Sequence, residues 1–338
     1  MAAGSRESFA WPSRFFPFSL MTLGIRDIAY YLPSGVRTNE EICRTHGFDE
    51  AFVSEKLGIT TRHVAAADES TADLCTGAAR KLLARSGVAP DSVELLIVVT
   101  QTPDYCLPHT AALVQESLNM PKSIATFDIN LGCSGYIYGL SAAIAFMEAN
   151  GMTTGVLITG EEYTKIMDPG DRATAPLFGD GAAATLLSHE PLYVVGKSTF
   201  GTDGSRHDAL IVLGSGTREG AREPLHMDGR IIFDFMMSEV PVDITNCLKL
   251  NGLNMEDIDA WVFHQASRYM LESLAKRAGI PQDRLVVDIE DVGNTTSSSI
   301  PIAVSRRILT MDDPLERIFL SGFGVGLSWA STVLTRLR

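Results

Sequence analysis

The sequence contains no long hydrophobic run. Across its 338 residues the apolar windows have the length of core strands, and none approaches the roughly 18 residues that a membrane-spanning helix requires. In the opening segment, Pro12, Arg14 and Pro17 interrupt every apolar run, so the continuous stretch of a signal peptide is missing. We therefore predict a soluble protein that does not enter a membrane, with residues 1–20 forming a loose N-terminal extension.

Cysteine is scarce and shows no pattern of pairing. The five cysteines are odd in number, widely scattered and without CxxC spacing: Cys43, Cys75, Cys106, Cys133 and Cys247. Such spacing predicts neither a disulfide framework nor a metal site. It is typical of a protein from a reducing compartment, and we predict a cytoplasmic location.

Basic residues are outnumbered by acidic ones. The chain carries 28 Lys and Arg against 41 Asp and Glu, a formal net charge of −13. This charge repels a phosphate backbone, which argues against nucleic-acid binding as the main function. An acidic protein partner would meet the same repulsion, so it would have to dock on a local basic patch. The content of 45% hydrophobic and 20% charged residues is that of a globular protein.

The chain contains an internal repeat at a separation of about half its length. Three segments recur in the same order: 87–99 resembles 252–264, 127–146 resembles 287–307, and 154–160 resembles 316–322. Each unit reads as two buried β-rich runs, a glycine turn with a helix, and a third strand ending in glycine. The repeat predicts two α/β halves, residues 21–190 and 191–338.

The apolar pattern of these units predicts a layered fold. The runs LLIVV, WVF, VLIT and IFL are continuous, as expected for strands that are covered on both faces. The helices after the glycine turns are apolar most of the way round, which is typical of buried helices. Two such halves sharing central helices would stack as helix, sheet, helix, sheet, helix, an arrangement that resembles the five-layer αβαβα thiolase fold.

A doubly wound nucleotide-binding fold is the structural alternative, because it also uses strand, glycine turn and helix units. The glycines argue against it. Gly132 and Gly135 flank a cysteine instead of forming GxGxxG, and FGDGAAATLL has a strand pattern after its glycines.

Polar residues stand at corresponding positions of the two halves. Cys133 lies at the strand-to-helix junction of the first half, Asn294 at the matching junction of the second, and His264 ends a strand before it. Each has an ordinary structural explanation: a small buried hydrophobe, a turn residue and a core histidine. Their occurrence at equivalent positions of a duplicated fold favours a shared site, with the His264 imidazole at the lip of a pocket.

Cys133 is the candidate nucleophile. It lies at an elbow where the backbone amides of a helix N-terminus face its sulfur and favour the thiolate. A contribution of about 1–2 kcal/mol would lower a thiol pKa of about 8.5 by roughly one unit. We therefore expect a thiolate fraction that supports thioester exchange without a strong general base.

Several blocks together resemble one family of condensing enzymes. They are LGITTRHVA (57–65), DINLGCSGYIYGL (128–140), DRATAPLFGDGAAATLL (171–187), VFHQAS (262–267), GNTTSSSIPIA (293–303) and SGFGVGLSWAS (321–331). These blocks span nearly the whole chain beyond residue 21 and resemble β-ketoacyl-acyl-carrier-protein synthase III, of the thiolase-like superfamily.

The resemblance implies a two-stage acyltransferase reaction. Cys133 would take an acyl group from coenzyme A (CoA), and malonyl-acyl carrier protein would then lose carbon dioxide and attack that group. His264 and Asn294 would donate hydrogen bonds to the thioester oxygen, while the amides of Cys133 and Val325 would form a second oxyanion hole. The resemblance also implies a homodimer with no permanently bound cofactor.

The remaining site residues are carried over from the same family. Phe52, Lys56 and Arg172 stand at positions that contact CoA, with Phe52 and Lys56 replacing a tryptophan and an arginine. Leu107 stands where a residue of the partner subunit closes the acyl pocket. A leucine there predicts a branched or longer acyl group, and packing of Leu107 inside its own subunit is the alternative. Carrier-protein docking falls to a basic set, Arg268, Lys276 and Arg277.

Three other functions share some of these features. A relative that joins the acyl group to a different nucleophile, or to a second acyl chain in secondary metabolism, would share the same residues. A papain-like cysteine hydrolase has the same order of Cys, His and Asn, but GCSGY does not match its CGSCW-like run. A non-enzymatic scaffold would have no need of all three polar residues.

Overall fold

The computed structural model describes residues 22–337, so the predicted extension 1–20 lies outside the described residues. The first half forms a sheet in the order β1-β7-β6-β4-β5. Its strands are β1 (Gly24–Tyr31), β4 (Leu95–Val99), β5 (Ala125–Ile129), β6 (Thr154–Glu161) and β7 (Gly181–Ser188). All residues of β4 and β7 are buried, which confirms that LLIVV and the FGDGAAATLL segment are strands covered on both faces.

The second half contributes the rest of the same hydrogen-bonded sheet, in the order β12-β13-β14-β8, with β9 also paired to β14. These strands are β8 (Tyr193–Val195), β9 (Thr199–Thr202), β12 (Ala260–Phe263), β13 (Arg317–Gly324) and β14 (Ser328–Arg336). The short β8 pairs with β1 on one side and β14 on the other, so it joins the two halves into ten strands. Two small ribbons lie apart from it: β2 (Gly35–Thr38) with β3 (Thr61–Val64), and β10 (Leu210–Ile211) with β11 (His226–Met227).

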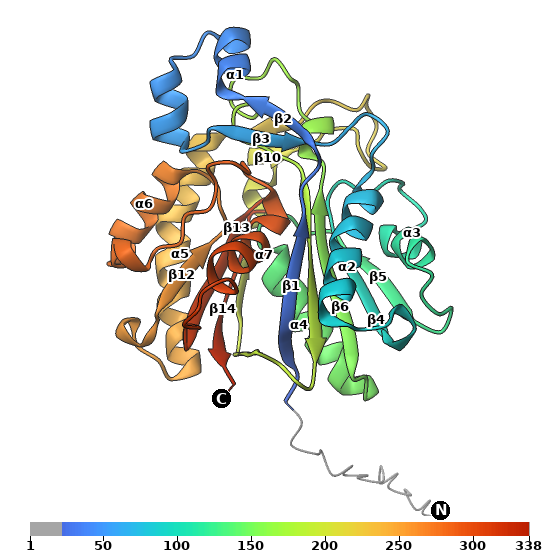
Figure 1. Cartoon of the computed structure of the whole chain (residues 1–338). Coiled ribbons are helices and arrows are strands. Elements are labelled where there is room, and N and C mark those ends of the chain that lie inside the picture. The colour runs from blue at the N-terminus through green and yellow to red at the C-terminus, as the bar shows by residue number, and fades with distance from the viewer. Residues whose placement is uncertain (1–21, 338) are drawn as a thin grey trace, which may run out of the picture.

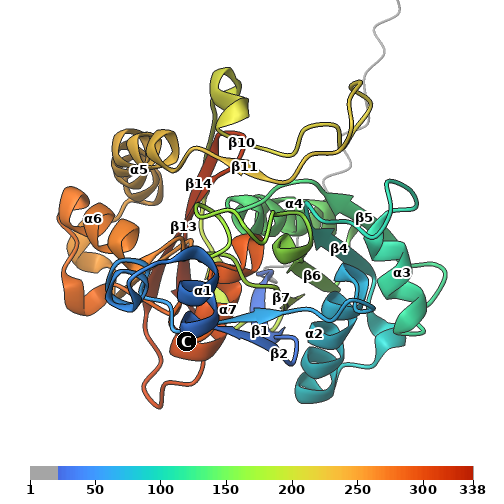
Figure 2. The same ribbon diagram turned by 90° about the horizontal axis from the view of Figure 1, so that it is seen from above.

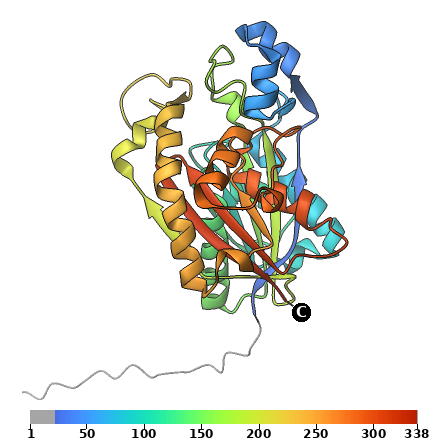
Figure 3. The same cartoon turned by 90° about the vertical axis from the view of Figure 1, so that its left-hand side faces the viewer.

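Helices form the other three layers. The central layer holds α4 (Gly135–Asn150) and α7 (Ser299–Ala303), whose apolar residues share one core with strands of both halves. Figures 1 and 2 show α2 (Thr71–Ser86) and α3 (Thr110–Ser117) covering one outer side and α5 (Gly229–Asn251) and α6 (Arg268–Ala278) the other. Figure 3 faces the latter side, with the long α5 in amber. The five-layer prediction is confirmed.

The second half copies the first incompletely. Its second β-rich run makes only one isolated bridge, Trp261 with Leu285, because the Asp288 N–H donates to the Gln265 side chain at 2.7 Å and not to a neighbouring strand. Its helix is also divided, into η7 (Thr296–Ser298), α7 and η8 (Val304–Ile308), whereas α4 is continuous. Pro301 lies inside α7 and has no N–H to continue a regular ladder. The prediction of a second complete strand is wrong.

One further segment caps the site end of the molecule. It comprises α1 (Asn39–His46) and the π-helix η1 (Phe52–Leu57), beside the β2–β3 ribbon. Thr38 caps α1 through a reciprocal bond with Glu41, and Gly47 ends it in the left-handed conformation. Within residues 22–337, no helix combines the length and apolar character needed to cross a membrane.

Candidate active site

Cys133 lies in the turn between β5 and α4, immediately before Ser134, the N-cap of the helix. The residue is buried. β13 passes so close that a Cβ added to Gly324 would lie 2.7 Å from the Cys133 sulfur. Gly322 is similarly close to the Cys133 carbonyl. Glycines at these two positions therefore allow the strand to approach the cysteine.

The electrostatic environment of Cys133 differs from the expectation. The backbone amides of Val325 and Cys133 both hydrogen-bond to the sulfur and lower its pKa, but burial outweighs them and raises the pKa to about 12. A helix terminus contributes only about 1–2 kcal/mol, whereas complete desolvation of a thiolate costs more. The prediction of a lowered pKa is wrong, and the resting group is a thiol.

His264 follows the last residue of β12, and its N–H donates to the Ser321 carbonyl of β13 at 2.8 Å. The side chain is buried, so it does not stand at a pocket lip as predicted. Burial lowers its pKa to about 4, which keeps the imidazole neutral at pH 7. Its Nδ1 lies 2.8 Å from the Ser299 hydroxyl, and its ring meets the Phe323 ring edge-on.

Asn294 connects the two halves through its backbone. Its N–H donates to the Leu177 carbonyl at 2.9 Å, and its carbonyl accepts from the Gly179 N–H at 3.1 Å. The side-chain Oδ1 accepts from the Thr296 N–H at 2.9 Å, so the residue does shape a turn. This bond holds the Oδ1 end of the amide and leaves Nδ2 as the donating end.

The three residues meet through shared neighbours. β13 contacts Cys133 through Gly324 and His264 through Ser321. Asn294 is linked to His264 through Thr296 and Ser299. The segment 177–179 of the first half also pairs with Asn294. Parts of the chain more than a hundred residues apart therefore converge at one place.

Two further polar residues belong to this region and were not predicted from the sequence. Ser299 contacts His264, and Glu161, at the end of β6, is completely buried. Glu161 accepts hydrogen bonds from the Gln101 N–H at 3.0 Å, the Thr102 hydroxyl at 3.0 Å and the Ser297 hydroxyl at 2.9 Å. Burial raises the pKa of this carboxyl to about 8. An acidic residue ending a buried strand, and a serine run after Asn294, were the available sequence clues.

The residues carried over for CoA lie around η1 and α1. The Phe52 side chain is outside the part of the chain that the structure describes. The Lys56 ammonium lies 5.3 Å from the centre of the Tyr269 ring, and the Arg172 guanidinium lies 4.6 Å from that of Phe48. Both cations thus rest on aromatic faces.

The predicted docking residues lie on or beside the same helix, α6. Arg268 begins it and packs against Gly58 at the end of η1. Lys276 and Arg277 stand in its last turn, where a surface hollow is lined by these two and by Phe233, Met237, Tyr269 and Ser273. Lys56 contacts Tyr269, which lines the same hollow, so one predicted CoA-binding residue lies beside the predicted docking residues.

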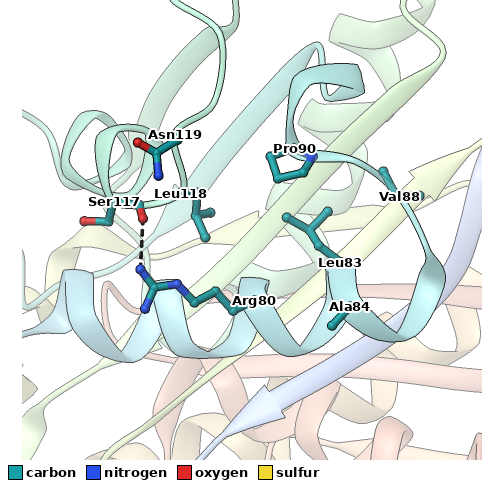
Figure 4. A pocket seen from close by; sticks show the side chains of 8 residues that line it. All are labelled: Arg80, Leu83, Ala84, Val88, Pro90, Ser117, Leu118 and Asn119. Atoms are coloured by element: carbon teal, nitrogen blue, oxygen red, sulfur yellow. Dashed lines mark hydrogen bonds between the residues drawn. The ribbon is translucent and has the colours of Figure 1, made fainter.

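Leu107 lies in the loop between β4 and α3 and is 81% exposed, with Tyr105 beside it at 60%. A side chain this exposed is not packed in its own chain, so the alternative placement of Leu107 inside its own subunit is wrong. Figure 4 shows a hollow elsewhere, beside α2, where Arg80 donates to the Ser117 carbonyl at 2.9 Å. None of the predicted site residues lines that hollow, so it is not the candidate active site.

Comparisons with known proteins agree with this geometry. The family description 3-oxoacyl-acyl-carrier-protein synthase III matches residues 127–204, and the C-terminal domain of that family matches residues 248–336. The β-ketoacyl-acyl-carrier-protein synthase III of Lactococcus lactis subsp. cremoris (strain MG1363) is 34% identical over 324 residues, covering 92% of this chain and 98% of the relative.

Two solved structures are similar over almost their full length. A 3-oxoacyl-acyl-carrier-protein synthase III crystal structure has a TM-score of 0.88 and 37% identity, covering 94% of this chain and 100% of the other. The priming β-ketosynthase of the R1128 polyketide pathway has a TM-score of 0.85 and 28% identity, covering 93% and 96%. The thiolase-like fold is thereby confirmed, and the nucleotide-binding and papain-like alternatives are wrong.

Proposed function

The chain belongs to the β-ketoacyl-acyl-carrier-protein synthase III family, and from this premise we propose that Cys133, His264 and Asn294 carry out its reaction. The protein is an acyltransferase that condenses an acyl group from acyl-CoA with malonyl-acyl carrier protein in fatty-acid biosynthesis. Acyl-CoA is a substrate, and the family uses no permanently bound cofactor. The scaffold reading does not hold.

In the first half-reaction the Cys133 sulfur attacks the thioester carbonyl. The new carbon–sulfur bond replaces the bond to CoA, and the Cys133 proton leaves with CoA as its thiol. The amides of Cys133 and Val325 already point to the sulfur, which supports their role as donors to the oxygen that becomes negative beside it. Since the resting group is a thiol, proton loss accompanies the attack.

In the second half-reaction His264 and Asn294 stabilise the enolate formed when the malonyl group loses carbon dioxide. The enolate carbon then attacks the acyl-Cys133 carbonyl and releases the Cys133 sulfur. The Ser299 hydroxyl lies 2.8 Å from His264 Nδ1 and 2.9 Å from the Thr296 carbonyl. These two contacts fix the orientation of the His264 imidazole within the site.

The observation that carries this assignment is that the end of β13 contacts both groups: Gly324 lies against the Cys133 sulfur, and Ser321 holds the backbone of the buried His264. Cys133→Ala should abolish acylation, because a methyl group cannot act as a nucleophile. Intact-protein mass after incubation with acetyl-CoA and longer acyl-CoA measures the adduct, and Cys247→Ala, which removes another buried cysteine, serves as the matched control. An acyl adduct that persists on the Cys133→Ala protein would refute the assignment.

CoA and the carrier protein would approach over η1 and α6. We assign CoA binding to Phe52, Lys56 and Arg172. Carrier docking falls to the basic group Arg268, Lys276 and Arg277. A net charge of −13 makes such a local basic group necessary for an acidic partner, and the apolar side chains of the same hollow add contact area.

A homodimer is the proposed assembly. Within residues 22–337, β5 ends the sheet and has a neighbour on one side only, and all five of its residues are half-buried. Leu107 and Tyr105 extend from the nearby loop with most of their surface exposed. Pairing of β5 edges would cover this strand and bring the Leu107 loop to the partner's site. Five free cysteines agree with a cytoplasmic location, which we also propose.

Use of another acceptor in a specialised pathway is the second candidate, and the similarity to the priming β-ketosynthase of a polyketide pathway supports such a pathway. Both candidates begin with the same acyl-Cys133. Reaction of the acylated protein with malonyl-acyl carrier protein, followed by mass detection of the β-ketoacyl product, decides between them.

A further inference from the structure

A hydrogen-bonded pair of polar side chains lies directly beside the nucleophile. The Tyr163 hydroxyl donates to Gln101 Oε1 at 2.8 Å, and Tyr163 is buried. A Cβ added to Gly132, the residue before Cys133, would lie 2.5 Å from Gln101 Oε1 and 2.6 Å from a Val325 methyl. The Gln101 amide therefore fills the space against the nucleophile turn.

Tyr163 continues this polar pair toward the other catalytic residues. Its ring lies 5.0 Å from that of Phe178, whose backbone is bridged to Asn294. Burial, followed by the nearby Glu161 carboxyl and Cys133 thiol, raises the pKa of Tyr163 well above its usual value. The hydroxyl is therefore neutral and stands between the Cys133 turn and the Asn294 turn.

The position of the pair is held from several sides. The Gln101 N–H donates to the buried Glu161 carboxyl at 3.0 Å, which anchors the backbone. The Gln101 amide nitrogen reaches Asn130 Oδ1 at 3.3 Å on the exposed side. Because its backbone N–H and its terminal amide are both hydrogen-bonded, the Gln101 side chain does not turn away to make room for a hydrocarbon chain.

The chemistry of the pair favours an oxygen-bearing ligand. The Tyr163 oxygen keeps a lone pair, and the Gln101 amide nitrogen has two N–H groups, of which Asn130 takes one. An alkyl chain pressed against these groups would separate them from water without replacing their hydrogen bonds. A hydroxyl or carbonyl oxygen on the chain would replace them.

We propose that Gln101 and Tyr163 form a polar wall of the acyl site and select a short acyl group with a hydrogen-bonding oxygen over an all-carbon group of the same shape. The proposal rests on acylation of Cys133 as described above. It concerns the side of the site near Gly132, whereas Leu107 acts from the partner subunit. The expected substrate class is a short 3-oxygenated acyl thioester.

The test compares 3-hydroxybutyryl-CoA with 3-methylbutyryl-CoA, which differ by a hydroxyl in place of a methyl group. The rate of Cys133 acylation is measured by intact-protein mass. The wild-type protein should prefer the hydroxylated group about tenfold, the effect of one typical net hydrogen bond. Tyr163→Phe and Gln101→Leu should each bring the ratio close to one.

Tyr193→Phe is the matched control. Tyr193 is equally buried and its hydroxyl donates to the Leu315 carbonyl at 2.9 Å, but it lies on β8. That variant should keep the wild-type ratio. Should Gln101→Leu fail to fold by circular dichroism, the nearly isosteric Tyr163→Phe decides alone.

A wild-type ratio of one or less would overturn the proposal, as would a ratio that survives in Tyr163→Phe. So would acylation by acetyl-CoA alone. In all three cases Cys133 still becomes acylated, so the proposed function would stand. A failure of every acyl-CoA, acetyl-CoA included, to label Cys133 would instead refute the proposed function.

Discussion

At the scale of single residues, burial sets the protonation state of the polar groups at the site. It raises the pKa of Cys133 to about 12 and that of Glu161 to about 8, and it lowers that of His264 to about 4. All three groups are therefore neutral at pH 7. A neutral site leaves the anionic malonyl group as the main local charge, which suits donors that act on an enolate.

His264→Ala and Asn294→Ala should separate the two half-reactions. Each variant removes a donor to the developing enolate, so malonyl decarboxylation and condensation should slow by about 100-fold or more. Acylation of Cys133 should remain largely intact, because its proposed oxyanion donors are backbone amides. Mass detection of the acyl adduct and carbon dioxide release measure the steps separately. Small, equal losses in both would indicate that these residues serve only packing.

Glu161→Gln should weaken the pH dependence of stability. The folded pKa of about 8 lies above the usual 4.5, so between these values the folded state holds a proton that the unfolded state has lost. The free energy of unfolding should therefore fall as pH rises from 5 to 8, by at most about 1.4 kcal/mol per pH unit from this group. The amide cannot ionise and removes this part of the slope. Glu162, whose pKa is raised to about 7, still contributes part of the pH dependence of stability in this variant.

Denaturant titrations at pH 5, 6, 7 and 8 provide the measurement. Glu94→Gln is the control, because the pKa of Glu94 is lowered and its stabilising effect is lost only at acidic pH. Identical slopes for the wild-type and Glu161→Gln proteins would show that Glu161 is already ionised in the folded state.

At the scale of secondary structure, β13 is the element that assembles the site. Its last residues contact the nucleophile turn through Gly322 and Gly324 and hold the end of β12 through Ser321. β13 can therefore carry no side chain at positions 322 and 324, where the Cys133 turn lies against it. Its two neighbours in the sheet, parallel β12 and antiparallel β14, fix this register.

Gly324→Ala should disable acylation more than it destabilises the fold. The new methyl group would lie 2.7 Å from the Cys133 sulfur and 3.0 Å from its Cβ, so the strand or the turn must shift. Overpacking of this kind costs about 1–3 kcal/mol in stability. The acylation rate should fall at least about tenfold. Gly204→Ala, at a position with open space, is the control. Wild-type acylation by Gly324→Ala would refute this role of β13.

At the scale of the whole molecule, the site lies where the two halves meet. Ser297 of the second half bonds to Glu161 of the first, and Asn294 pairs with residues 177–179. We propose residues 21–190 and 191–338 as the two halves, since the division falls between β7 and β8. The β5 edge and the exposed Leu107 loop extend this arrangement toward a second copy of the chain.

Leu107→Phe should shift the acyl preference toward acetyl. If the Leu107 loop closes the partner's acyl site, a larger planar ring leaves less room for a branched or longer chain, and one methylene is worth about 1–3 kcal/mol there. Thermal stability should change little because the side chain is exposed. Light scattering on the purified protein should show a dimer. Val242→Phe, another exposed apolar position, is the control. A monomer, or an unchanged chain-length profile, would contradict the arrangement.

The sequence by itself determined the elements and the residue types of the site. Continuous apolar runs predicted the strands β4, β6, β12 and β13, and the glycines around Cys133 predicted the elbow before α4. These features follow from short segments of sequence. Glycine allows the chain to turn sharply, and a continuous apolar run is typical of a buried strand. The repeat added the order of layers, although it overestimated the second half, where Asp288 bonds to Gln265 instead of a strand.

Only the tertiary structure decided the protonation of the site and the partners that hold it. The Glu161 carboxyl meets the Ser297 hydroxyl across 136 residues, and His264 meets Ser299 from another element. The pKa of Cys133 depends on how completely both halves exclude water from it, and the sequence around the helix N-terminus does not indicate this. Desolvation sums over every atom packed around a group, and those atoms come from distant parts of the chain.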